Sequence, residues 1–251
     1  MTARPIAMVT GATRRVGLAI ARAMARSGFD LVLTYNTGSG RLAEVRDELE
    51  PLGAGVVFEH LDLTDLGASE SLAARLAEDL PRLDVLVHNA SAYVPTPLAQ
   101  TTAASVESLM RVHAIAPLLI TKHLAPRLAQ SALPGGGAIV AMGDIHALGR
   151  PRRDFAAYAM SKAALVEMVR SLARDLAPRV RVNGIAPGVV AFPDEGHESD
   201  PAAQEAYLRK VPLERSGTPD DAAEVVRWLA LDAHYVTGEI VRVDGGRWLT
   251  P

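Results

Sequence analysis

The sequence contains no cysteine, few aromatic residues and no long run of one charge, and each of these absences excludes a class of protein. Without cysteine the chain forms no disulfide, offers no thiolate to a metal ion and has no cysteine nucleophile. Aromatic residues make up 4% of the chain, so the core must be built mainly from alanine, leucine and valine. The formal net charge is −3, and the basic clusters at 14–15 and 150–153 are too short for a nucleic-acid-binding surface.

Membrane segments, signal peptides and metal sites are not indicated either. No apolar run approaches the roughly 20 residues that a membrane-spanning helix needs. The first five residues lead directly into a short apolar strand, without the h-region of a secretory signal. The histidines show no His-x-x-x-His or His-Glu-x-x-His spacing, so we expect no metal site. We therefore expect a cytoplasmic protein without a membrane or nucleic-acid partner.

Short apolar strands alternate with helices along the whole chain. We expect strands at 6–10, 31–35, 56–59, 83–87, 138–142, 179–185 and 240–243. We expect helices at 16–27, 40–52, 66–80, 155–177 and 222–231, and two helical stretches over roughly 102–131. Because the strands are nearly continuous apolar runs, they predict a parallel sheet covered by helices on both faces, in one α/β domain over 1–251. Such sheets bind ligands at the carboxyl ends of their strands.

The stretch 189–212 is expected to be irregular, because Pro, Asp, Glu and Gly cluster at 193–201. We interpret it as a substrate-loop insertion that acts as a mobile lid. Phe192, Tyr207 and Leu208 are candidate substrate contacts, and packing would explain them as well.

Tyr158 and Lys162 lie four residues apart in a predicted helix, so they share one face. A free phenol ionises near pH ~10, which makes it a poor proton donor at neutrality. We expect the ammonium of Lys162 to lower the pKa of Tyr158 and make the pair usable as a general acid. The spacing alone is equally typical of two solvated neighbours, so the assignment depends on the rest of the chain.

A loop of small residues, 10–17, connects the first strand to the first helix. Gly11 and Gly17 would let the backbone approach a pyrophosphate, and the helix amino terminus favours its negative charge. The loop does not match G-x-G-x-x-G, and an ordinary strand-to-helix turn is the alternative. The candidate cofactor residues of this loop are Gly11, Arg14, Arg15 and Val16.

The end of the second strand indicates which dinucleotide binds. NAD sites usually place a carboxylate there to accept the ribose hydroxyls. This chain has Asn36 and Thr37 instead, and Arg14 or Arg15 could meet a 2′-phosphate. We therefore expect NADP(H).

Several motifs together resemble the short-chain dehydrogenase/reductase family. They are Thr10-Gly11 with Gly17, Asp62, Asn89-Ala90, Tyr158 with Lys162, Asn183, and Pro187-Gly188. The resemblance implies a Rossmann-type, doubly wound parallel sheet in three α/β/α layers, hydride transfer from a nicotinamide cofactor, and usually a homotetramer. It also implies cofactor contacts for Asp62, Leu63, Asn89, Ala90, Ser91, Tyr158, Lys162, Pro187 and Gly188, with Lys162 on the nicotinamide ribose.

Two departures from the family pattern narrow the resemblance to pteridine reductases. Asp144 stands where the family usually has a serine that binds a substrate carbonyl, and Arg15 stands where it generally has glycine. Asn89-Ala90-Ser91 followed by Tyr93, and the run 111–117, also look like pteridine reductases.

The chemistry supports this interpretation. An ionised aspartate would repel the oxyanion that develops when a carbonyl is reduced. A pterin is reduced at a C=N bond, where a proton must reach nitrogen, and Asp144 with Tyr158 could supply it. Tyr93 could stack on the flat ring. The predicted substrate residues are Arg15, Ser91, Tyr93, Asp144 and Tyr158, and the predicted catalytic residues are Asp144, Tyr158 and Lys162; for Asp144 the alternative is a loop residue that caps a turn.

Three questions stay open. His113 aligns with an asparagine that the family uses near the lysine, and it is either a functional replacement or a helix-interface histidine. The substrate is a dihydropterin or dihydrofolate, or else the carbonyl of a 3-oxoacyl thioester or a sugar. A cofactor-binding regulatory protein without turnover is the third possibility.

Overall fold

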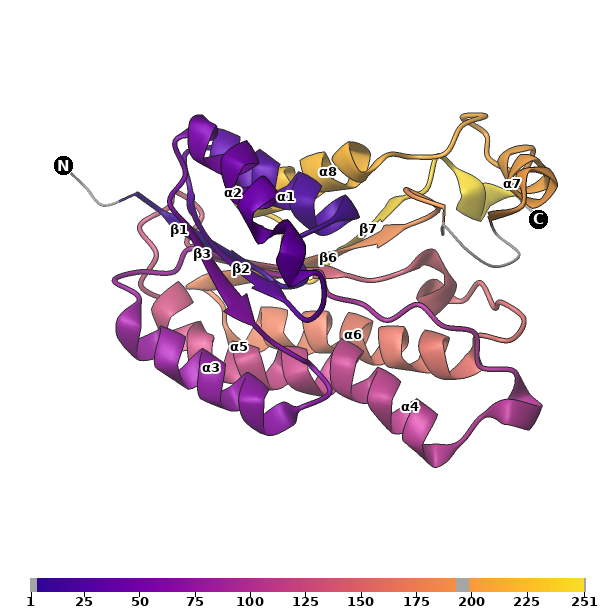
Figure 1. Ribbon diagram of the computed structural model, residues 1–251, viewed down its shortest axis with the longest axis horizontal. Coiled ribbons are helices and arrows are strands. Elements are labelled where there is room, and N and C mark those ends of the chain that lie inside the picture. Colours follow the sequence, from indigo (N-terminus) through magenta and orange to yellow (C-terminus); the bar gives the residue numbers. More distant parts are fainter. Residues whose placement is uncertain (1–3, 193–198, 251) are drawn as a thin grey trace.

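Seven parallel strands form one sheet in the computed structural model, which describes residues 4–192 and 199–250 (Figure 1). The strand order is β3-β2-β1-β4-β5-β6-β7. The strands are β1 (Ile6–Val9), β2 (Asp30–Tyr35), β3 (Val56–His60), β4 (Val85–His88), β5 (Gly137–Met142), β6 (Val180–Pro187) and β7 (Ile240–Val243). Because the order reverses between β1 and β4, the sheet is doubly wound, as predicted.

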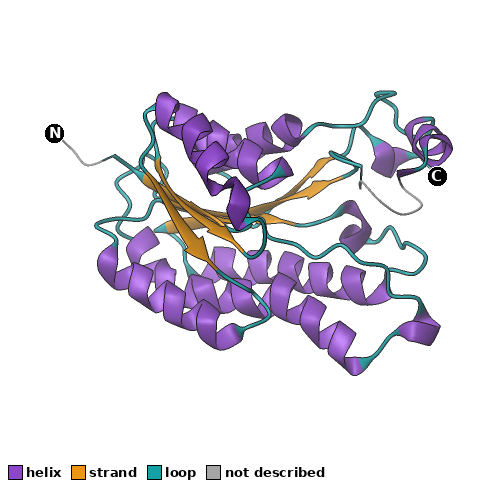
Figure 2. Cartoon of the chain, in the orientation of Figure 1, coloured by secondary structure: helices purple, strands orange, loops and turns teal. Residues whose placement is uncertain are grey.

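Helices cover both faces of the sheet in three layers (Figure 2). On one face lie α1 (Arg15–Arg26), α2 (Leu42–Leu49) and α8 (Pro219–Leu231). On the other lie α3 (Leu66–Asp79), α4 (Ala103–Met110), α5 (Ala116–Leu128) and α6 (Ala156–Asp175). The short helix α7 (Pro201–Leu208) stands beyond the carboxyl ends of β6 and β7, close to the carboxyl-terminal end of the chain.

The side chains of alternate strand residues pack into two separate hydrophobic cores, one on each face of the sheet. On β1, Ala7 and Val9 pack toward α1 and α8, whereas Ile6 and Met8 pack toward α3 and α5. All four residues are buried, which accounts for the unbroken apolar runs in the sequence. The predicted α/β class and layer order are therefore confirmed.

One prediction about secondary structure is wrong. Part of the stretch expected to be irregular, 189–212, forms α7. Asp200 caps this helix by accepting a hydrogen bond from the Ala202 N–H, and Pro201 occupies its first turn. The cap signature is present in the sequence, but the same residues are equally typical of a turn. Residues 193–198 of the predicted lid lie outside the described residues.

The two helical stretches predicted over 102–131 form one continuous run that contains a π-helical segment, Arg111–Ile115, between α4 and α5. Pro117 has no N–H to donate to the His113 carbonyl, so the regular ladder is interrupted there. This run, Ala103–Leu128, is the one described helix that is long and apolar enough to cross a membrane by length and composition alone. Core helices of soluble proteins pass the same test, and here the run packs on α3 and α6.

Candidate active site

A cleft of about 650 Å³ opens at the carboxyl ends of the strands, where the strand order reverses. Fifteen of the seventeen predicted site residues line it: Gly11, Arg14, Arg15, Val16, Asn36, Thr37, Asn89, Ala90, Ser91, Tyr93, Asp144, Tyr158, Lys162, Pro187 and Gly188. Asp62 and Leu63 do not. Asp62 accepts hydrogen bonds from the N–H and the hydroxyl of Thr64, both 2.8 Å, and Leu63 is buried in the core. Their contact with the cofactor stays a prediction.

The loop after β1 brings backbone close to the cleft because two of its residues are glycine. A Cβ on Gly17 would lie 2.2 Å from the Gly11 carbonyl oxygen, and Gly11 itself has a left-handed φ of 64°. The first turn of α1 carries no acidic residue and no side-chain cap, a helix start that suits an anion. The two glycines leave a space that a pyrophosphate fits, and larger side chains at these positions would fill that space.

Asn89, at the end of β4, braces that loop. Its side-chain amide donates to the carbonyl oxygens of Thr10 (2.9 Å) and Gly11 (3.0 Å). The Thr10 hydroxyl in turn accepts from the backbone N–H groups of Asn89 and Ala90, at 3.0 and 3.1 Å. Asn89 therefore shapes the loop in addition to lining the cleft.

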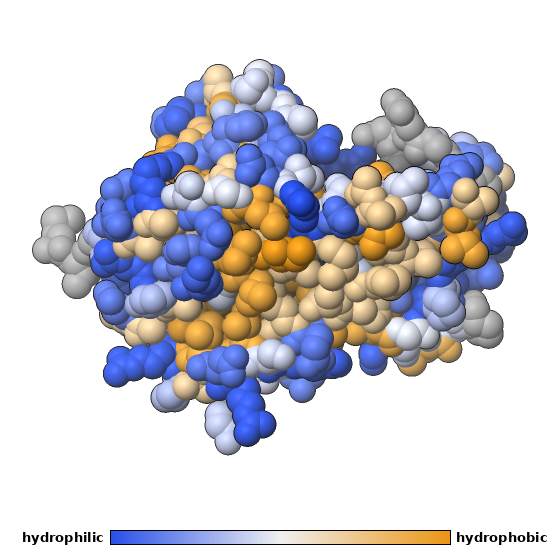
Figure 3. All heavy atoms as spheres, turned by 90° about the horizontal axis from the view of Figure 1, so that it is seen from below, coloured by the Kyte–Doolittle hydropathy of each residue, from blue (hydrophilic) through white to orange (hydrophobic). Residues whose placement is uncertain are grey.

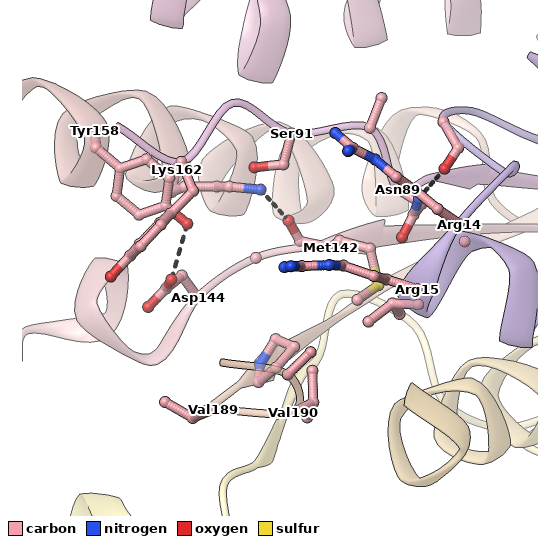
Figure 4. A pocket seen from close by; sticks show the side chains of 18 of the residues that line it. Arg14, Arg15, Asn89, Ser91, Met142, Asp144, Tyr158, Lys162, Val189 and Val190 are labelled. Atoms are coloured by element: carbon pink, nitrogen blue, oxygen red, sulfur yellow. Dashed lines mark hydrogen bonds between the residues drawn. The ribbon is translucent and has the colours of Figure 1, made fainter. Parts of the chain in front are cut away.

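Arg15 is one of three described residues other than glycine with a left-handed φ, here 48°. Its side chain is exposed and extends from the start of α1 into the cavity, toward the side where Asp144 and Tyr158 lie (Figure 4). Residues held in this conformation cluster at functional sites, because the surrounding structure must maintain the strain. The strain is compatible with the family's preference for glycine at this position.

The predicted carboxylate and phenol are in direct contact. The Tyr158 hydroxyl donates a hydrogen bond to Asp144 Oδ2 at 2.8 Å (Figure 4). The other oxygen of Asp144 accepts from the His146 N–H at 2.7 Å, so the carboxylate also caps the turn that follows β5. The capping interpretation of Asp144 is thus confirmed, and the cap orients the carboxylate toward Tyr158. The catalytic role of Asp144 stays a prediction.

Lys162 does not act on Tyr158 as expected. Its ammonium donates to the Met142 carbonyl oxygen at 2.6 Å. Burial, followed by the neighbouring Asp144 carboxylate, raises the pKa of Tyr158 well above its usual value. The prediction that Lys162 lowers this pKa is wrong, because burial and Asp144 raise it instead. Burial also lowers the pKa of Lys162 itself to about 8.

His113 projects from the π-helical segment into the base of the site and is 1% exposed. Its Nε2 lies 2.9 Å from the Ser91 hydroxyl and accepts from the Ala92 N–H at 3.1 Å. Its Nδ1 lies 2.8 Å from the Ser161 hydroxyl. Burial lowers the pKa of His113 to about 2, so the ring is neutral.

Tyr93 belongs to an aromatic group at the cleft mouth. Its ring stacks on Phe155 with centroids 4.9 Å apart and meets Tyr158 edge-on at 5.2 Å. The guanidinium of Arg152 lies 4.4 Å from the centre of the Phe155 ring and hydrogen-bonds the Tyr93 hydroxyl. The sequence offered Arg152 only as part of a short basic cluster, so its place in the cleft was missed.

The far wall of the cleft comes from the loop after β6 and from α7. The Val189 N–H donates to the Tyr207 hydroxyl at 3.2 Å, which ties α7 to this loop. Tyr207 lines the cleft, whereas Phe192 lies behind it in edge-on contact with its ring, at 6.1 Å between centroids. Leu208 does not line this cleft.

Positive charge dominates the lining. Asp144 is the sole carboxylate among the described residues that line the cleft, against Arg14, Arg15, Arg152 and Lys162. Tyr35, Asn36 and Thr37 form the lining at the end of β2, where no carboxylate is present. No group of three His, Asp or Glu side chains suited to a metal ion occurs within 4–192 and 199–250.

Known proteins resemble this chain over nearly its whole length. The sequence profile of the family described as Enoyl-(Acyl carrier protein) reductase matches residues 11–247. Pteridine reductase 1 of Leishmania tarentolae is 32% identical, over 98% of this chain and 97% of its own length. A granaticin polyketide synthase putative ketoacyl reductase 2 of Streptomyces violaceoruber is 31% identical, over 98% and 96%. The crystal structure of a putative short-chain alcohol dehydrogenase from Sinorhizobium meliloti 1021 superposes with a TM-score of 0.90 at 30% identity, covering 98% of this chain and 97% of the other.

Proposed function

The chain belongs to the short-chain dehydrogenase/reductase family of nicotinamide-dependent oxidoreductases, and from that premise we propose that it is an NADPH-dependent pteridine reductase. The substrate would be a dihydropterin or dihydrofolate, reduced at a C=N bond. The observation that carries this proposal is the 2.8 Å hydrogen bond from the Tyr158 hydroxyl to the Asp144 carboxylate.

A carboxylate in this position suits a nitrogen-containing ring better than a carbonyl. An anion beside the reacting group opposes the negative charge that a reduced carbonyl oxygen acquires. The amino and ring N–H groups of a pterin are donors, and Asp144 has only acceptor oxygens to offer them. Once Asp144 accepts from such donors, the Tyr158 hydroxyl can turn to the ring nitrogen that must gain a proton.

The remaining side chains position the reactants. Bound NADPH supplies the hydride. Burial and Asp144 hold the pKa of Tyr158 high, so the phenol is protonated before the reaction but is a weak acid. Lys162, fixed by the Met142 carbonyl, presents its ammonium beside the place where we expect the nicotinamide ribose. Tyr93 offers a ring face at the mouth, already stacked on Phe155, for the flat substrate.

The preference for NADPH follows from charge at the end of β2. Asn36 and Thr37 line the cleft there without a carboxylate to bind ribose hydroxyls, and Arg14 and Arg15 are exposed nearby. Gly11, Val16, Asn89, Ala90, Ser91, Pro187 and Gly188 complete the proposed cofactor site, with Asp62 and Leu63 at its edge.

Steady-state oxidation of NADPH with dihydrobiopterin and dihydrofolate tests the proposal. We expect turnover in the wild type, and its loss in Asp144→Ala and Tyr158→Phe while NADPH binding, measured by fluorescence titration, is retained. Wild-type protein that turns over neither pterin contradicts the proposed substrate class.

A carbonyl reductase is the second candidate, favoured by the similarity to a ketoacyl reductase. Asp144 in place of serine is the feature against it. By the same charge argument, Asp144→Ser, which restores a neutral donor, should raise activity on 3-oxoacyl thioesters or sugar ketones. A regulatory protein without turnover would bind NADPH and reduce neither class; the intact Tyr158 and Lys162 weigh against it.

We expect a cytoplasmic homotetramer, and an exposed apolar face supports the self-association. Viewed from the side of α3–α6, an apolar band crosses the middle of the molecule (Figure 3). Ile115 and Leu118 on the run that leads into α5, and Met160 on α6, are 38%, 46% and 60% exposed. In the most apolar 18 residues of that run only 33% are buried, so a second copy of the chain would cover what this one leaves open.

A further inference from the structure

We propose that His113 is a positioning residue: it holds the Ser91 hydroxyl where that group donates a hydrogen bond to the Tyr158 oxygen as Tyr158 gives up its proton. The proposal rests on the assignment of Tyr158 as proton donor in the function proposed above. It follows from a complete account of the donors and acceptors around His113.

Three hydrogen bonds assign the tautomer of His113. The Ala92 N–H can only donate, so Nε2, 3.1 Å away, carries a lone pair. The ring is neutral, so its one proton is on Nδ1 and goes to the Ser161 hydroxyl oxygen at 2.8 Å. The Ser161 hydroxyl donates its own hydrogen to the Tyr158 carbonyl oxygen, also at 2.8 Å, so its oxygen can accept from Nδ1.

Ser91 then has one hydrogen and two acceptors. One is Nε2 of His113, at 2.9 Å; the other is the phenol oxygen of Tyr158, to which Ser91 hydrogen-bonds as well. While Tyr158 is protonated, both acceptors are neutral, and the hydrogen rests on Nε2. A phenolate accepts a much stronger, charge-assisted bond, so the hydroxyl turns to it when the proton leaves.

The Ala92 N–H lowers the free-energy cost of this rotation of the Ser91 hydroxyl. After the Ser91 hydrogen moves away, Nε2 still accepts from the Ala92 N–H, so no buried acceptor is left unpaired. Proton and charge balance along the same path: the O–H bond of Tyr158 breaks, an N–H bond of the substrate forms, and the phenolate is stabilised by Ser91 until solvent returns the proton. His113 itself neither gains nor loses a proton.

The matched control is a second buried histidine with a hydroxyl partner. His88 is 3% exposed, and its Nε2 lies 2.8 Å from the Thr121 hydroxyl on α5, which does not line the cleft. Ser91→Ala and Thr121→Ala therefore remove bonds of similar length from similar partners. Only Ser91→Ala removes a hydroxyl that contacts Tyr158.

The experiment compares kcat and KM in Ser91→Ala, His113→Phe, His113→Gln, the double variant Ser91→Ala/His113→Phe and Thr121→Ala. We expect kcat to fall about tenfold or more in Ser91→Ala and His113→Phe, the value of one hydrogen bond to a charged group, with KM nearly unchanged. The double variant should be no slower than Ser91→Ala, because His113 acts through Ser91. His113→Gln, whose side-chain oxygen can accept from Ala92, should recover most of the rate, and Thr121→Ala should lose stability without losing kcat.

Effects of Ser91→Ala and His113→Phe that multiply in the double variant, or a full kcat in either single variant, would overturn the proposal. If His113→Phe does not fold, Ser91→Ala and His113→Gln still decide it. A wild type that reduces a carbonyl and no pterin would refute the proposed pteridine reductase function. The same variants would then be compared with that carbonyl as the substrate. If no substrate turns over, a titration of tyrosinate absorbance replaces the kinetic comparison, with Tyr158→Phe as the baseline. In Ser91→Ala, Tyr158 should ionise at a higher pH than in the wild type. An unchanged titration refutes the contact.

Discussion

The Lys162 ammonium bonds to the Met142 carbonyl oxygen at 2.6 Å, across the gap between α6 and the end of β5. A carbonyl is a weaker partner for a buried ammonium than a carboxylate, and burial lowers the pKa of Lys162 to about 8, although Asp144 opposes the shift. The backbone thus holds the lysine in place, but burial makes its charged form less favourable.

This arrangement predicts how stability depends on pH. Burial lowers the pKa of Lys162 to about 8 in the folded protein, below the ordinary lysine pKa of 10.5, so the unfolded chain binds more protons between these values. Stability from this group therefore rises as pH increases through about 8 toward 10. We expect Lys162→Met, which has no charge to bury, to be more stable than wild type at pH 7, with the difference shrinking by pH 9.5 in thermal unfolding. A difference independent of pH contradicts the assignment.

Replacement of Arg15 separates backbone strain from binding. Arg15→Gly and Arg15→Ala both remove the guanidinium, but only glycine adopts the φ of 48° without strain. We expect Arg15→Gly to be more stable than Arg15→Ala by about 1 kcal/mol in chemical denaturation. Both variants should show a raised KM for NADPH; equal stabilities would mean that the surrounding loop relaxes.

A carboxylate introduced at the end of β2 should change cofactor preference. Asn36→Asp places an anion where a 2′-phosphate is expected and where NAD sites accept the ribose hydroxyls. We expect the ratio of kcat/KM for NADPH over NADH to fall about tenfold or more, the effect of one unfavourable charge contact. Asn36→Ser is the neutral control and should keep the wild-type preference; a ratio that falls equally in both variants would argue against a phosphate at this position.

The apolar face of α5 can be tested by charge. Leu118→Glu places a carboxylate at a half-exposed apolar position of α5, and we expect it to shift the protein toward smaller species in light scattering coupled to size exclusion. Leu98→Glu changes a residue that is 87% exposed on the short turn Leu98–Gln100, and it serves as the control. A wild type that is monomeric at all concentrations contradicts the proposed homotetramer.

The predicted α/β class was confirmed because strand and helix periodicity are local. Strands such as Leu31–Leu33 are buried on both faces, and this appears in the sequence as an unbroken apolar run. Helix α7 was missed because its cap, Asp200 followed by Pro201, uses the same residues as a turn. The π-helical segment was missed because a proline two residues after it affects a hydrogen bond that periodicity does not show.

The sequence by itself determined the class of fold, the edge of the sheet that holds the cleft and fifteen of the residues that line it, since short motifs at strand ends converge in any parallel sheet. The tertiary structure alone decided which partners these residues take. Tyr158 bonds to Asp144, fourteen residues earlier, and His113 bonds to Ser91 and Ser161 on two other segments. Those contacts depend on the register of β4, β5 and α6 and on how deeply each group is buried. Burial and Asp144 raise the pKa of Tyr158, which Lys162 was expected to lower.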